Sequence, residues 1–203
     1  FYSEKIVEMG GNFANKIWNV SRFVLMNLEG FNPNEVDVNS LNFEIVDNWI
    51  FSRLNSAIKE TNRHLDKFYL NDAAKSAYDF LWGDFCDWYV ETAKARLYNN
   101  EDEQSKKTAQ FVLWYVLEQG LRLLHPFMPY ITEEIWQKLQ SEKDMTIVLA
   151  EYPVVNEEMI NTEVEKTMAF IQEILKSIRN IRTEMNIVPS KGIRAVLNTA
   201  EGE

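Results

Sequence analysis

The side chains with the clearest potential to bind a ligand lie on one face of a helix predicted near the start of the chain. Over residues 11–26, the sequence GNFANKIWNVSRFVLM repeats apolar residues three or four positions apart, the spacing of an amphipathic helix. Its other face combines amides, cations and aromatic rings, namely Asn12, Asn15, Lys16, Trp18, Asn19, Arg22 and Phe23. Amide and guanidinium groups read the hydrogen-bonding edges of bases, and aromatic rings stack on unpaired bases. We therefore predict that this face binds a single strand of RNA.

The same side chains also have a purely structural interpretation. Trp18 and Phe23 border the apolar stripe, so they would equally well pack in the core. The amides and Lys16 would then hydrogen-bond to a neighbouring helix, and Arg22 would pair with an acid such as Asp47. Both interpretations stay open at the level of the sequence.

A second group of cations lies near the C-terminal end of the chain. Lys176, Arg179 and Arg182 recur three positions apart in a helix predicted over residues 162–186. Such a group either contacts an RNA backbone or is a solvated helix face. We predict it as a second, weaker contact with the RNA backbone.

The total charge argues against nucleic acid as a partner, but the distribution of charge does not. The 203 residues carry 21 Lys and Arg against 31 Asp and Glu, a formal net charge of −10, whereas phosphate binding normally needs a basic surface. Residues 1–30 hold three acids and three bases, and residues 161–194 hold four acids and six bases. RNA is therefore expected near the first and last predicted helices.

No catalytic or metal-binding residues can be identified in the sequence. The two histidines, His64 and His125, lack the spacing with Glu or Cys that metal sites require. Cys86 stands in an apolar helix, which is typical of a buried structural thiol, and there is no glycine-rich phosphate loop. The single Cys, the lack of a signal peptide and the lack of a long apolar run predict a cytoplasmic protein without a membrane partner.

The periodicity predicts an all-α helical bundle with a small C-terminal α/β appendage. Helices are expected at about 2–28, 45–68, 72–98, 106–124, 132–139 and 162–186, and strands at 146–149 and 193–197. The third helix is apolar around most of its girth, which is typical of a central helix. We assign residues 1–144 to the bundle and residues 145–203 to the start of the α/β subdomain. The first residue, Phe1 instead of Met, suggests a piece of a longer protein.

Five stretches of the sequence carry a family resemblance. They are GNFANKIWNVSRFVLMN at 11–27, DNWIFSRLN at 47–55, YDFLWGDFCDWYVE at 78–91, LLHPFMPYITEEIWQ at 123–137 and IRNIRTEMNIVPSK at 178–191. In this order they resemble the anticodon-binding domain of valyl-tRNA synthetases, which are class I enzymes. The fourth stretch is shared with isoleucyl and leucyl relatives, whereas the first and third look valyl-type.

The resemblance implies a helical bundle that holds the anticodon stem-loop of valine tRNA, within a monomeric enzyme that ligates valine to this tRNA using ATP and Mg²⁺. The catalytic and editing domains would lie elsewhere in the same chain, so no cofactor is expected in this stretch. Some relatives have Arg at the positions of Gly11 and Asn48, so Lys16 and Arg22 would supply more of the positive charge here. Two alternatives stay open: the same domain of an isoleucyl- or leucyl-tRNA synthetase, or a helical scaffold that binds proteins and no RNA.

Overall fold

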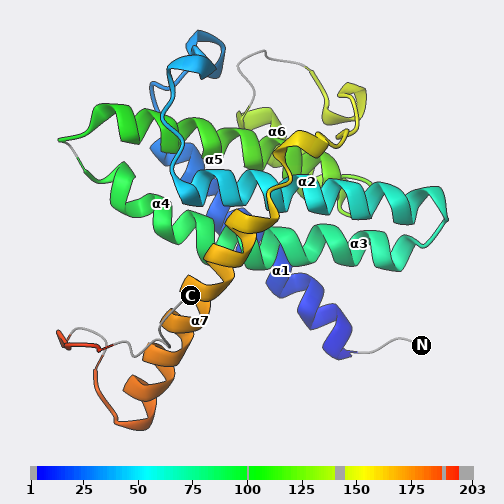
Figure 1. Ribbon diagram of the computed structural model, residues 1–203. Coiled ribbons are helices and arrows are strands. Elements are labelled where there is room, and N and C mark those ends of the chain that lie inside the picture. Colours follow the sequence, from blue (N-terminus) through cyan, green and yellow to red (C-terminus); the bar gives the residue numbers. More distant parts are fainter. Residues whose placement is uncertain (1–3, 100, 140–144, 189–190, 197–203) are drawn as a thin grey trace. The chain divides into compact units, whose positions relative to one another are not determined.

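The computed structural model describes residues 4–99, 101–139, 145–188 and 191–196 (Figure 1). No β-strand occurs within these ranges, and the predicted all-helical bundle is confirmed. The chain separates into two compact units, Phe1–Thr162 and Glu163–Glu203. Among the described helices, none combines the length and the apolar content that crossing a membrane would need.

The first unit consists of helices that follow one another through turns. In chain order they are α1 (Glu4–Asn27), η1 (Pro33–Glu35), η2 (Val38–Ser40), α2 (Ile45–Asp66), α3 (Leu70–Asp79), η3 (Phe80–Tyr89), α4 (Val90–Leu97), α5 (Glu103–Leu124), α6 (Pro129–Leu139), η4 (Ile147–Leu149) and η5 (Glu157–Met159). The η elements are 3₁₀ turns except η3, a π-helix that continues α3 directly into α4. The helix predicted at 72–98 is this continuous run. The second unit is formed largely by α7 (Thr162–Glu184).

Helix α5, rather than the run from α3 to α4, is the centre of the bundle. It contacts α1, α2, α3, α4 and α6, and its buried residues include Val112, Leu113, Val116, Leu117 and Leu121. A Cβ at Gly120 would stand 2.7 Å from Cδ2 of Leu81 in η3, so the missing side chain lets the two helices approach closely. The expectation that the α3–α4 run is central is wrong, because Asp72, Lys75 and Asp79 leave one side of α3 exposed.

A fully buried carboxylate ties three helices of the bundle together. Asp47 accepts hydrogen bonds from the Tyr89 hydroxyl at 2.7 Å, from Nη1 of Arg96 at 2.8 Å to each oxygen, and from the backbone N–H of Glu44 at 2.9 Å. A buried charge is tolerated only when it is paired and hydrogen-bonded in this way. Burial and the neighbouring carboxylate raise the pKa of Tyr89 well above its ordinary value, so its hydroxyl remains a donor. The start of α2, the end of η3 and α4 therefore meet at one residue.

Neither predicted strand is present in the described residues. The run at 146–149 contains the 3₁₀ turn η4, residues 193–196 have no regular secondary structure, and residue 197 lies outside the described part. The carboxylate of Glu133 in α6 accepts hydrogen bonds from the Thr146 hydroxyl at 2.7 Å and from the Ile147 N–H at 3.2 Å. The side chain of Ile147 is buried. This apolar run therefore packs on the bundle as a capped turn instead of pairing in a sheet.

The segment that follows η4 is attached to α2, so the boundary between the units falls at residues 162–163 rather than at 144–145. Oδ1 of Asn55 accepts a hydrogen bond from the Asn156 N–H at 2.8 Å, and Oγ of Ser52 accepts one from the Asn161 N–H at 2.8 Å. Both acceptors are on buried residues of α2. Because these bonds join positions 101 and 109 residues apart, periodicity within one segment does not reveal them.

Replacement of Asp47 by Ala is expected to lower the free energy of unfolding by about 3–5 kcal/mol, because it removes the buried carboxylate that pairs with Nη1 of Arg96 and leaves the buried Tyr89 hydroxyl without its acceptor. The measurement is a urea titration followed by circular dichroism. Asp66→Ala, at the exposed end of the same helix, is the control and should change stability by less than about 0.5 kcal/mol. Equal effects of the two substitutions would contradict the role given to Asp47.

A second buried carboxylate, Glu118 in α5, predicts a pH-dependent stability. Burial raises its pKa above 4.5 even though Arg122 pairs with it. A raised folded-state pKa means that the contribution of Glu118 to stability is complete below about pH 4.5 and is lost as the pH rises through the folded pKa.

Glu118→Gln keeps an acceptor for Arg122 and removes the charge. Its free energy of unfolding, relative to that of the unmodified chain, should therefore rise from about pH 4 to about pH 7. Glu60→Gln is the control, because a hydrogen bond from Arg63 lowers the pKa of Glu60 and the relative stability should change with the opposite sign. A pH-independent difference for Glu118→Gln would show that its carboxylate ionises equally well in the folded and unfolded chains.

Candidate nucleic-acid interface

Four of the predicted RNA-binding residues form one exposed stripe along α1. Asn12, Asn15, Asn19 and Arg22 are spaced by three, four and three positions, which aligns them on one side of a helix, and all four are exposed. In the described part of the chain, no hydrogen bond or ion pair holds any of these side chains. Three amides and a guanidinium are therefore available to a ligand. We call these four residues the α1 stripe.

Lys16 is at the edge of the stripe and is already engaged by η3. Its Nζ lies 2.6 Å from Oδ1 of Asp87 and 3.6 Å from the ring centroid of Trp82. The Trp82 ring stacks in turn on Tyr78, with centroids 5.7 Å apart. Lys16 therefore contacts a neighbouring helix, as the structural interpretation of the sequence expected. Much of its charge is compensated by Asp87 before any ligand binds.

Trp18 and Phe23 border the stripe on its two sides, and both are half-buried. Nζ of Lys138 in α6 lies 4.7 Å from the Trp18 ring centroid, and Nζ of Lys94 in α4 lies 5.4 Å from the Phe23 ring centroid. Each ring thus holds a cation from a neighbouring helix beside the stripe. The sequence analysis did not identify either lysine, because both are far from α1 along the chain. Each also has a Glu three or four positions before it, which indicates an ordinary ion pair within its own helix.

Arg22 does not pair with Asp47, the acid considered from the sequence. Asp47 is occupied by Arg96, as described above. Arg22 stays exposed on α1. One further residue extends the stripe by a turn: Met26, four positions on, is 73% exposed. An exposed Met at this position offers a flexible apolar contact beside the polar groups.

The second predicted group of cations lies in the second unit. Lys176 and Arg179 are exposed on α7, three positions apart. Arg182 instead points its Nη2 at the turn after the helix, where it donates to the carbonyls of Val188 at 2.6 Å and Lys191 at 2.9 Å. The structure therefore gives Arg182 a role in holding that turn and leaves Lys176 and Arg179 together on the helix surface.

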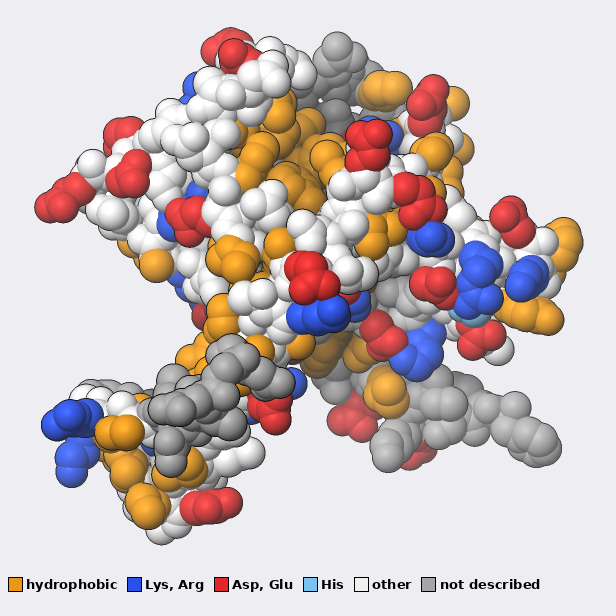
Figure 2. Space-filling model, in the orientation of Figure 1, with side chains coloured by type: hydrophobic (Ala, Val, Ile, Leu, Met, Phe, Trp, Pro, Cys, Tyr) orange, Lys and Arg blue, Asp and Glu red, His pale blue; other side chains and the backbone are white. Residues whose placement is uncertain are grey.

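No large single-sign patch covers the face of the molecule drawn in Figure 2. Lys and Arg side chains are interspersed there with Asp and Glu, in keeping with the net charge of −10. Non-specific attraction of phosphates is therefore weak on this side.

The described residues contain no group of His, Cys, Asp and Glu side chains that would hold a metal ion. Nδ1 of His125 lies 2.7 Å from Oγ1 of the buried Thr132 and so belongs to the link between α5 and α6. Cys86 is buried, and burial raises the pKa of its thiol to about 12. A thiol with such a pKa is no nucleophile at neutral pH.

The fold agrees with what is found among known proteins. The family model of the anticodon-binding domain of tRNA ligases matches residues 47–197, and the chain belongs to this family. Its relatives include the valine–tRNA ligase of Fusobacterium nucleatum, 53% identical over all of this chain and 23% of that protein, and the valine–tRNA ligase of Geobacter sulfurreducens, 50% identical over 95% of the chain and 22% of that protein. The chain thus spans about a fifth of the length of these relatives.

Among solved structures, the LeuRS of Agrobacterium radiobacter K84, in a ternary complex with tRNA and LeuAMS, aligns with a TM-score of 0.52. The alignment covers 74% of this chain and 16% of the LeuRS chain, at 18% sequence identity. A likeness at this identity concerns the fold alone. It supports the helical-bundle architecture.

Cys86 is expected to be inert toward thiol reagents in the folded chain, because its thiol is buried and its pKa is about 12. Ellman's reagent at about pH 8 should release no thionitrobenzoate from the folded protein and one equivalent after unfolding in urea. Rapid reaction of the folded chain would show that the thiol is accessible and ionisable. The measurement is the absorbance of thionitrobenzoate. The sample unfolded in urea is the control that shows the reaction going to completion.

Proposed function

We propose that this chain recognises the anticodon stem-loop of valine tRNA as part of a valine–tRNA ligase. The observation that carries the proposal is the α1 stripe: three amides and a guanidinium, exposed and unpaired within the described residues, in a chain about half identical to valine–tRNA ligases along nearly its whole length. An exposed helix face normally favours Glu and Lys for helix propensity, so repeated Asn residues without a partner favour a ligand-binding role.

In this proposal the amides of Asn15 and Asn19 hydrogen-bond to the Watson–Crick edges of unstacked anticodon bases. Asn12 extends the same surface by a turn. Arg22 contacts a base edge or a phosphate with its planar guanidinium. Trp18 and Phe23, both half-buried, offer the exposed part of their rings at the borders of the stripe, while Lys16 contributes less than its charge suggests because Asp87 holds it.

The larger enzyme supplies the chemistry. Ligation of valine to tRNA with ATP and Mg²⁺ takes place in a catalytic domain outside these residues, and anticodon binding helps to hold the distant acceptor end there. We further propose that the enzyme is a cytoplasmic monomer, and that Lys176 and Arg179 of the second unit make a weaker contact with the tRNA backbone. Arg182 is set apart from this contact by its bonds to the turn after α7.

The test is a comparison of affinities for valine tRNA and for the same tRNA with a substituted anticodon, by band shift at physiological salt. The chain should prefer the valine anticodon, and Arg22→Ala should weaken binding by about tenfold. Asn15→Ala and Asn19→Ala should reduce the preference between the two tRNAs, because each removes a group that reads a base edge. Arg63→Ala, which removes an exposed arginine paired with Glu60 on α2, is the matched control and should leave both affinities unchanged.

Equal affinity for both tRNAs would overturn the proposal. A preference for isoleucine or leucine tRNA would assign the chain to a sibling ligase instead. Lys16→Ala is a less informative variant, because loss of the ion pair with Asp87 and of the contact with Trp82 would also lower stability. Urea titrations of each variant separate the two effects.

A further inference from the structure

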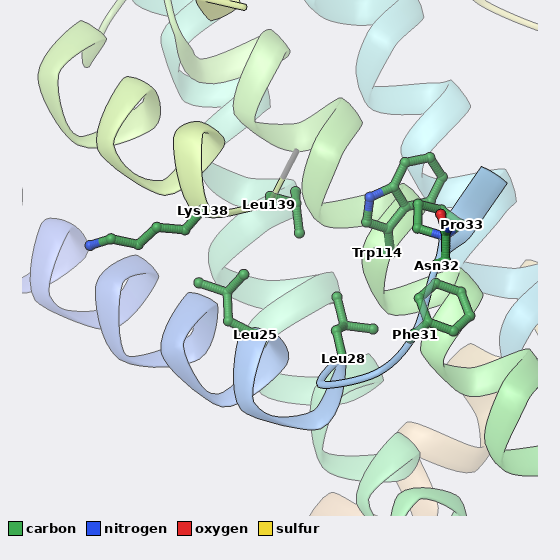
Figure 3. Close-up of a pocket in the computed structure, with 8 residues that line it drawn as sticks. All are labelled: Leu25, Leu28, Phe31, Asn32, Pro33, Trp114, Lys138 and Leu139. Atoms are coloured by element: carbon green, nitrogen blue, oxygen red, sulfur yellow. The ribbon is translucent and has the colours of Figure 1, made fainter. Parts of the chain in front are cut away.

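A cavity opens next to the C-terminal end of the α1 stripe (Figure 3). It has a volume of about 210 Å³ and is lined by Leu25, Leu28, Phe31, Asn32, Pro33, Trp114, Lys138 and Leu139. Gly30, with a φ of 77°, allows the tight turn after α1 that brings Phe31 and Pro33 to the wall. The volume is smaller than the roughly 300–1,000 Å³ of pockets for drug-sized ligands. It suits one flat ring system.

The only side-chain donor buried at this cavity, among the described residues, is an indole without a partner. Nε1 of Trp114 is buried and finds no acceptor within hydrogen-bond distance. Figure 3 shows the nitrogen-bearing edge of the Trp114 ring directed toward Leu139 and Leu25, into the space between the labelled side chains. An unsatisfied buried donor costs about 1–3 kcal/mol. An occupant with a carbonyl or a ring nitrogen would relieve that cost.

Two residues of the cavity wall lie near the stripe. Leu25 lies in α1 three positions after Arg22, within one helical turn. The stem of Lys138 lines the cavity while its Nζ lies 4.7 Å from the Trp18 ring centroid at the border of the stripe, and Figure 3 shows this side chain running away from the other lining residues. A strand lying on the stripe would therefore pass the mouth of the cavity.

We infer that this cavity binds one unstacked nucleobase of the RNA strand that lies on the α1 stripe. The base inserts its plane between the apolar walls, and a carbonyl oxygen or an unprotonated ring nitrogen accepts a hydrogen bond from Nε1 of Trp114. This inference rests on the proposed function and adds a specific subsite to it. Apolar side chains such as Leu25, Leu28 and Leu139 contact the base, and the buried donor at the Trp114 edge distinguishes bases that present an acceptor there from those that do not.

The first experiment observes the donor directly. The chain has six Trp residues, so six indole N–H resonances are expected in a nitrogen–proton correlation spectrum, and Trp114→Phe assigns one by its loss. Titration with an anticodon stem-loop should move the Trp114 resonance downfield, as expected when its proton enters a hydrogen bond. A Trp114 resonance that stays in place while resonances of the stripe shift would overturn the inference.

The second experiment tests coupling between the indole and one base. Trp114→Phe keeps an aromatic ring and removes the donor, and it should weaken binding of the intact stem-loop by about fivefold to tenfold. Stem-loops with an abasic site at each loop position in turn should include one for which Trp114→Phe has no further effect. Leu28→Phe, which narrows the cavity, should weaken binding of the intact stem-loop and spare the same abasic one.

Trp49→Phe is the matched control, since Trp49 is buried in α2 and is not among the residues that line the cavity; it should leave RNA affinity unchanged. If the losses of binding free energy from Trp114→Phe and from the abasic site were additive at every loop position, the subsite would be overturned. Discrimination between anticodons by the unmodified chain would be unaffected by that result. Loss of discrimination by the unmodified chain would instead overturn the proposed function itself. The two failures are therefore distinguishable.

Discussion

The buried carboxylate of Asp47 is the constraint on which the rest of the first unit depends. It joins the start of α2 to the end of η3 through Tyr89 and to α4 through Arg96. An ionised group in the interior is stable only while its partners stay in place, so these helices have little freedom to shift. The same two elements, η3 and α4, form one border of the α1 stripe, with Lys16 held by η3 and Lys94 of α4 lying over Phe23. The position of the helices beside the α1 stripe thus depends on the hydrogen bonds of Asp47, although neither Asp47 nor its partners belong to the stripe.

The opposite border depends on α6 and on the central helix α5. Lys138 of α6 reaches Trp18, and Trp114 of α5 forms part of the cavity beyond the end of the stripe. The candidate interface is therefore a helix face set between two packed neighbours. The chain is acidic overall and three of the nearby lysines each pair with a carboxylate, so long-range attraction of RNA would contribute little to the proposed interface. In the proposed interface, short-range hydrogen bonds would supply most of the selectivity, because the four side chains of the α1 stripe have no partner within the described residues.

Much of this architecture could be predicted from the sequence. The amphipathic spacing on α1 predicted a helix with a distinct polar face, and Asn12, Asn15, Asn19 and Arg22 are indeed exposed on it. The strand predictions at 146–149 and 193–197 failed because a short apolar run is compatible with a strand and equally with a buried turn or helical segment. At the first of these, Glu133 caps the turn from another helix. The expected boundary at residue 145 differs from the structural one for a similar reason, since buried Asn55 and Ser52 bind backbone groups of a segment distant along the chain.

The sequence by itself determined the helical class, the exposed face of α1 and the absence of recognisable catalytic motifs, because these follow from residue type and from spacing within one segment. Only the tertiary structure decided which cations are free. Lys16 is held by Asp87, Arg182 by the carbonyls of Val188 and Lys191, and Lys94 and Lys138 arrive beside the stripe from other helices. Hydrogen bonds, ion pairs and ring contacts act over a few ångströms, and positions far apart in the chain come within that range only after the helices have packed.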